Sequence, residues 1–93
     1  MIYQITPYTK AKAKKLNVLI TPSTRKNKKI DVFTSSGKYI TSIGDNKYLD
    51  FPNYLIQYGK EYANKRRKAY KKRHEKDRHK KGSAGYYADQ LLW

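Results

Sequence analysis

The segment from Lys60 to Lys81 constrains the fold of this chain more than any other. It holds twelve of the protein's twenty-two Lys and Arg residues, against only Glu61, Glu75 and Asp77. Like charges at this density repel one another, so the segment cannot condense into a core by itself and favours contact with an anionic surface. The candidate surfaces are nucleic acid, an acidic protein face and an anionic membrane.

The rest of the charge lies in blocks. Residues 1–30 carry eight cations and no acid, whereas residues 31–59 are nearly neutral. The net charge is +15 over 93 residues, and Leu, Ile, Val and Phe are scarce, which approaches the composition of disordered chains. Ten Tyr residues and one Trp compensate, because aromatic rings bury a large area while keeping a polar edge in water. The sequence therefore predicts one small domain with a partly aromatic core.

Residues 30–43 give the clearest β signal. Two β-branched runs flank the turn Ser35-Ser36-Gly37, which predicts a hairpin. Residues 44–47 form a second turn before 48–51, so a three-stranded antiparallel meander is the simplest account, with Pro52 ending the pairing. Residues 16–20 are a further strand candidate. We expect residues 1–28 to form a basic N-terminal arm outside a domain at 29–93.

The hydrophobic period becomes helical after the meander. Leu55, Tyr58, Tyr62 and Tyr70 share one side of a helix and cations cover the rest, which predicts a basic helix over 55–81. Gly82 is a helix stop, and a cap at the next residue predicts a C-terminal helix over 84–92. The expected fold is α+β: a small antiparallel β-meander with a long basic helix and a short apolar C-terminal helix packed on the sheet.

Cations interleaved with an aromatic ring suit phosphate neutralisation combined with base stacking. The expected contacts to nucleic acid, DNA or RNA, are Lys65, Arg66, Arg67, Tyr70, Lys71, Lys72, Arg73, His74 and Arg78. No motif in the sequence reads bases, so we expect the binding to be non-specific. In the alternative interpretation, a minor capsid or cement protein seats this helix and the N-terminal arm on acidic faces of other capsid subunits. A third interpretation is a merely solvated helix face.

The last residues are among the most apolar of the chain. Tyr86, Tyr87, Leu91, Leu92 and Trp93 require burial, either on the hairpin or in a neighbouring molecule. We therefore expect them to form a protein-interaction surface that supports homo-oligomers.

Catalysis and metal binding are not indicated. His74 and His79 lie five residues apart, whereas the helical zinc motif needs histidines four apart on one face. The chain has no Cys, and no nucleophile, general base or Gly-rich phosphate loop accompanies its acids. We expect a non-enzymatic protein with no cofactor. No apolar run of about 18 residues is present, so we also expect no membrane span.

Four motifs follow one another in an order that resembles a family of small basic proteins encoded by large nucleocytoplasmic DNA viruses. They are Ile43-Gly44-Asp45 with Tyr48 and Asp50-Phe51, the basic run 66–74, the step 82–87, and Leu91-Leu92-Trp93. The resemblance covers about residues 29–93. It implies a virion component, present in the host nucleus or cytoplasm during assembly, and it supplies no mechanism.

Overall fold

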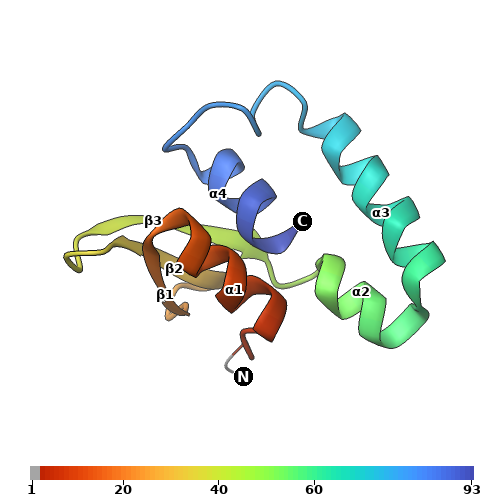
Figure 1. Ribbon diagram of the computed structural model, residues 1–93, viewed down its shortest axis with the longest axis horizontal. Helices are drawn as coiled ribbons and strands as arrows, with labels where there is room; N and C mark the ends of the chain where they lie inside the picture. The colour runs from red at the N-terminus through yellow and green to blue at the C-terminus, as the bar shows by residue number, and fades with distance from the viewer. Residues whose placement is uncertain (1–2) are drawn as a thin grey trace.

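In the computed structural model, which describes residues 3–93, a three-stranded antiparallel sheet is accompanied by four helices (Figure 1). The elements are α1 (Pro7–Leu16), β1 (Val18–Pro22), β2 (Lys28–Thr34), β3 (Tyr39–Asp45), α2 (Phe51–Tyr58), α3 (Lys60–Arg73) and α4 (Ala84–Leu92). Figure 1 shows α1 and α4 beside the sheet, and α2 and α3 as a bent pair to one side. The α+β prediction is confirmed. Within residues 3–93, no helix is both long and apolar enough to cross a membrane.

The predicted hairpin is present as β2 and β3. The strands pair in antiparallel register, with Ile30 opposite Ile43 and Asp31 opposite Ser42. The turn contains Gly37 at φ 92°, a left-handed conformation that glycine adopts without steric cost. The predicted C-terminal helix is also present, and the hydroxyl of Ser83 caps it by accepting a hydrogen bond from the backbone N–H of Tyr86.

The third strand is not where we expected it. The segment 48–51 was predicted to complete the meander, but Asp50 caps α2, and its carboxylate accepts a hydrogen bond from the backbone N–H of Asn53. Pro52 lies in the first turn of this helix, where its missing N–H costs nothing. The sheet is instead completed by β1, which pairs with β2 to give the order β1-β2-β3.

The N-terminal segment is folded into the domain, whereas the sequence predicted a basic arm outside it. Residues 7–22 form α1 and β1, both of which pack into the domain, while residues 1 and 2 lie outside the described part of the chain. Thr6 caps α1, and the hydroxyl of the fully buried Thr9 donates to the carbonyl of Leu91 in α4 at 2.9 Å. A buried hydroxyl with a partner 82 residues away ties this end of the chain to the core.

The predicted basic helix over 55–81 is wrong in both its start and its end. Gly59, at φ 92° and ψ 169°, separates α2 from α3, because no helical residue adopts that conformation. After Arg73 the chain runs through turns until α4 begins. No residue from 74 to 82 is fully buried, so burial no longer offsets the repulsion between cations in that segment.

The core joins the sheet to both chain ends. Ile30, Val32 and Ile43 are at most 1% exposed and pack in one cluster with Leu91 and Leu92 of α4. Asp31 lies between the two β2 residues and points to the other face of the sheet, where Ser23 and Ser42 donate to it at 2.6 Å. Burial would raise the pKa of Asp31, but these hydrogen bonds outweigh that effect and the pKa is lowered.

A second buried carboxylate, Asp50, is fully enclosed. Besides capping α2, it accepts hydrogen bonds from the ammonium of Lys29 in β2 at 3.1 Å and from the hydroxyl of Tyr3. Lys29 is also buried, at 5% exposure. One carboxylate thus links the N-terminal segment, the central strand and the start of α2. Burial, and then the Asp50 carboxylate, raise the pKa of Tyr3 above its usual range.

Asp50→Asn tests how strongly this buried pair is coupled. The substitution leaves the Lys29 ammonium buried without a matching charge, so we expect it to lower the free energy of unfolding by about 3–5 kcal/mol. In a Lys29→Met background, the same substitution should cost only about 1 kcal/mol, since no buried cation remains to be matched. Urea unfolding of the four proteins measures the coupling. An equal cost in both backgrounds would show that the ion pair is not what Asp50 contributes.

Gly44 is a position in β3 that only glycine fits. Its φ is 82°, and an added Cβ would lie 2.9 Å from the Cδ of Lys29 and 3.0 Å from a Leu92 methyl. Gly37 has a similar φ of 92°, but an added Cβ there would meet no atom of the described chain within 4 Å. Comparing the same substitution at the two glycines therefore distinguishes the cost of backbone strain from the cost of crowding.

Gly37→Ala should cost about 1–2 kcal/mol, the strain of a left-handed alanine. Gly44→Ala should cost about 1–3 kcal/mol more, because the methyl group also overpacks the core. Thermal unfolding of both variants provides the comparison. Equal losses of stability would mean that the neighbours of Gly44 relax freely.

Candidate nucleic-acid interface

Helix α3 concentrates the positive charge of the structure. Eight of its fourteen residues are Lys or Arg, and Glu61 is its single acid. Figure 1 shows α3 along one side of the molecule, connected to α2 by a bend. Gly59 lies between the two helices. The side chains of α3 fall into three environments, which decide what each cation can contact.

The first environment is the outward face. Lys65, Lys68 and Lys72 are exposed and have no ion-pair partner within residues 3–93. Their spacing of three and then four residues places them on one side of the helix, along about 10 Å of its axis at about 1.5 Å per residue. We refer to these three residues as the lysine row. Lys68 was missing from the set predicted above, although its spacing from Lys65 would have identified it.

The second environment is aromatic. The guanidinium of Arg66 lies 5.3 Å from the centroid of the Tyr54 ring, and that of Arg67 lies 4.0 Å from the Phe51 ring. Arg67 also donates to the side-chain carbonyl of Asn64 at 2.9 Å. These contacts hold α3 against α2 without neutralising either charge, because a ring face attracts a cation but carries no net charge. Both side chains are half-buried and remain cationic.

The third environment is acidic. The ammonium of Lys71 lies 2.8 Å from the carboxylate of Asp89 in α4, which is 2% exposed. Arg78 contacts the same carboxylate at 3.8 Å and Glu75 at 2.9 Å. We expected both cations to contact phosphate, whereas the structure matches them with acids. Their role here is to fasten α3 and the following turns to α4.

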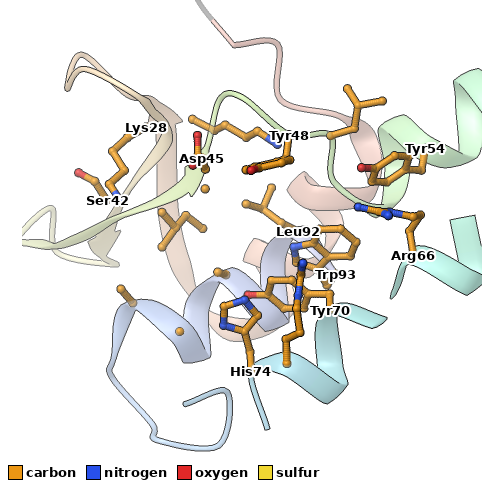
Figure 2. Close-up of a pocket in the computed structure, with 18 residues that line it drawn as sticks. Lys28, Ser42, Asp45, Tyr48, Tyr54, Arg66, Tyr70, His74, Leu92 and Trp93 are labelled. Carbon is orange, nitrogen blue, oxygen red and sulfur yellow. The ribbon is translucent and has the colours of Figure 1, made fainter. Parts of the chain in front are cut away.

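Tyr70 was expected to stack on a base, but it belongs to the core. The ring is 8% exposed and stacks on Trp93 at a centroid distance of 4.4 Å and an interplanar angle of 8°. The half-buried ring of His74 lies 4.4 Å from the same tyrosine, which places the three rings in a series (Figure 2). Burial, and then the nearby Asp89 carboxylate, raise the pKa of Tyr70 to about 12.

An alkaline titration tests this arrangement. The folded state disfavours the phenolate of Tyr70. The neutral Tyr70 side chain therefore contributes its full stabilising free energy below the usual tyrosine pKa of about 10. That contribution is lost as the pH rises toward about 12. Absorbance of tyrosinate at alkaline pH should show a late component that disappears in Tyr70→Phe, while the ring stack remains. Tyr58→Phe, at an exposed ring, is the control and should leave the late component in place. Loss of the same component in both variants would contradict the burial of Tyr70.

The predicted protein-interaction residues lie mostly inside the molecule. Leu91, Leu92 and Trp93 are 0%, 1% and 8% exposed, and Tyr86 and Tyr87 are half-buried in edge-to-face contact. The apolar tail therefore packs on the sheet of its own chain, as expected for the C-terminal helix. It does not present the exposed surface that we expected to support homo-oligomers.

Burial of acids makes the surface more positive than the composition suggests. Asp31, Asp50 and Asp89 are buried, whereas Lys29 is the one buried cation of the described residues. Twenty-one cations and four acids consequently remain at least partly accessible. One of those acids, Glu75, is already hydrogen-bonded to His79 and Arg78, and both bonds lower its pKa.

Other sequence-predicted cations border a cleft between α3 and β3. Arg66, Arg73 and His74 line it together with Lys28 and Tyr48, which we had not assigned to the site. In the part of the chain that the structure describes, no three His, Asp or Glu side chains gather as metal ligands. Comparisons with protein-family models, curated proteins and solved structures find no match for this chain.

Proposed function

We propose that this protein binds nucleic acid without base specificity and without catalysis, by neutralising phosphates with the exposed face of α3. The observation that supports this most is the exposed lysine row, Lys65, Lys68 and Lys72. The ion pair between α3 and α4 uses a different residue, Lys71. Arg66, Arg67 and Arg73 flank the row and add charge. A protein surface so poor in acids attracts a polyanion over a long range and releases its counterions on contact.

The proposed setting is a virus particle, and it rests on the resemblance of the motifs alone. A basic protein inside a virion would condense or organise the genome through contacts that ignore sequence. Those contacts need charge density and exposure, which α3 and the loops around it supply.

A second candidate is a minor capsid or cement protein that binds acidic faces of other shell subunits. The supporting observation is a group of exposed apolar side chains around the bend between α2 and α3. They are Leu55, Ile56, Tyr58 and Tyr62, and Ile56 is 74% exposed. Apolar side chains beside a basic helix suit a protein partner better than a phosphate backbone. The part of this candidate that used a threading N-terminal arm loses its support, because residues 7–22 are folded.

Binding to random duplex DNA at about 50 and about 200 mM salt tests the first proposal. We expect micromolar or tighter affinity at the lower concentration and a loss of orders of magnitude at the higher one, because neutralised phosphates release counterions. Replacing Lys65, Lys68 and Lys72 together by Gln should reduce the slope of log K against log salt by about 3, at about 0.9 per phosphate contact.

A matched control removes the same charge elsewhere. Lys10, Lys14 and Lys15 are exposed on α1, and their replacement by Gln should change the salt slope much less. If both triple variants lose equal affinity, the affinity depends on the net charge of the protein and not on the lysine row of α3. Failure of the unmodified protein to bind DNA at the lower salt concentration would favour the capsid candidate.

A further inference from the structure

A cleft lies between α3 and β3. It has a volume of about 560 Å³, within the range of about 300–1,000 Å³ found for small-molecule sites. The loop after β3 forms one side of it, and residues of β2, β3, α2, α3 and α4 form the rest. Figure 2 shows Tyr48 on one side, Tyr70 and His74 on the opposite side, and Leu92 and Trp93 between them.

The charge of the cleft selects an anionic ligand. Lys28, Arg66 and Arg73 line it without an ion-pair partner in the described chain. A fourth lining cation, Lys29, is already matched by Asp50. The one acid of the lining, Asp45, accepts a hydrogen bond from the backbone N–H of Lys47 in the turn after β3. Three unmatched cations around one cavity favour phosphate.

Arg66 provides an independent indication of a ligand. Its Nε is buried, yet it has no hydrogen-bond partner in residues 3–93. Buried donors are nearly always satisfied, and one left open beside a cavity is what a bound acceptor would complete. In Figure 2 the guanidinium of Arg66 lies near Tyr54 and Trp93, inside the ring-lined part of the cleft.

The rings of the cleft favour a ligand with a flat aromatic part. The faces of Tyr70 and Trp93 are largely used by their mutual stack. Tyr48, in contrast, is 62% exposed at the rim. An exposed tyrosine at the mouth of a cationic cleft offers a base one stacking surface. Inorganic phosphate or an acidic peptide would leave that surface unused.

We propose that the cleft receives one unpaired nucleotide, with its phosphate between Lys28 and Arg73 and its base against Tyr48. This inference rests on the proposed function, because the strand that supplies the nucleotide is held by α3. A base within a duplex is already stacked and paired, so it cannot enter the cleft, whereas an unpaired base can. The protein would consequently prefer single strands, ends or gaps over continuous duplex.

Trp93 is the single tryptophan of the chain and lines the cleft, so its fluorescence reports occupancy directly. The probes are dAMP, ribose 5-phosphate, inorganic phosphate, an oligothymidylate and a blunt duplex closed by hairpins at both ends. We expect dAMP and the single strand to change the emission, and the two phosphates without a base to bind about tenfold or more weakly than dAMP, since base stacking supplies that difference. The closed duplex should bind without changing the emission.

Two matched pairs of variants locate the site. Tyr48→Ala should weaken dAMP and single-strand binding by about tenfold, whereas Tyr58→Ala, at a ring 60% exposed outside the cleft, should not. Arg73→Gln should weaken dAMP binding, whereas its neighbour Lys72→Gln, on the outward face, should affect only long nucleic acids. All four positions are exposed, so none of these substitutions creates a cavity in the core.

The outcomes separate this inference from the proposed function. If duplex and single strand bind through the lysine row but neither dAMP nor the single strand alters Trp93, the cleft proposal fails alone. If dAMP binds in the cleft and no strand binds, the protein takes a free nucleotide and the strand-binding proposal fails. If inorganic phosphate binds as tightly as dAMP, or if Tyr48→Ala has no effect, the base contributes nothing and the proposal is overturned.

Discussion

Three buried carboxylates hold this structure together, and the rest of its properties depend on where they lie. Asp31 joins β2 and the loop before it to β3, Asp50 joins the N-terminal segment and β2 to α2, and Asp89 joins α4 to α3. A buried carboxylate is costly unless donors surround it, so each of these sites fixes several segments at once. The chain has only seven acids, and placing three of them inside leaves the surface with few charges to match its cations. The fold and the positive surface therefore have one cause.

The unmatched cations of this surface repel one another, and the repulsion is greatest along α3. The helix is held by the ring contacts of Arg66 and Arg67, by the stack of Tyr70 on Trp93, and by Lys71 on its carboxylate. None of these contacts neutralises the outward face. A polyanion that binds the folded state relieves this repulsion and stabilises the protein by mass action, because the unfolded chain presents its cations at lower density. Under the proposed function, binding and stability would therefore be coupled through the same side chains.

The elements that depend on turn and cap residues nearby in the sequence were predicted correctly. The elements that depend on contacts between distant residues were not. The hairpin and α4 follow from turn and cap residues within a few positions, and both are found as expected. Asp50 followed by Pro52 is a helix-start signal as well as a strand end, and the distant contact of Asp50 with the buried Lys29 favours the helix start. The break at Gly59 was hidden by an apolar pattern that continues across it. Of the candidate site, the density of charge on α3 was predictable, but the cations available to a partner were not. Lys71 differs from Lys72 only because a carboxylate in α4 lies within reach.

The cleft borders two positions at which packing requires a glycine. Gly44 and Gly85 both line it, and both are positions where a side chain would collide with the fold, with Lys29 and Leu92 in one case and with Asp77 in the other. These glycines let β3 and the start of α4 approach their neighbours closely. The need for glycine at both positions follows from packing and is not evidence for a ligand. The side chains that carry that evidence are Tyr48 and Arg73, because both are exposed and the fold has no evident need of either.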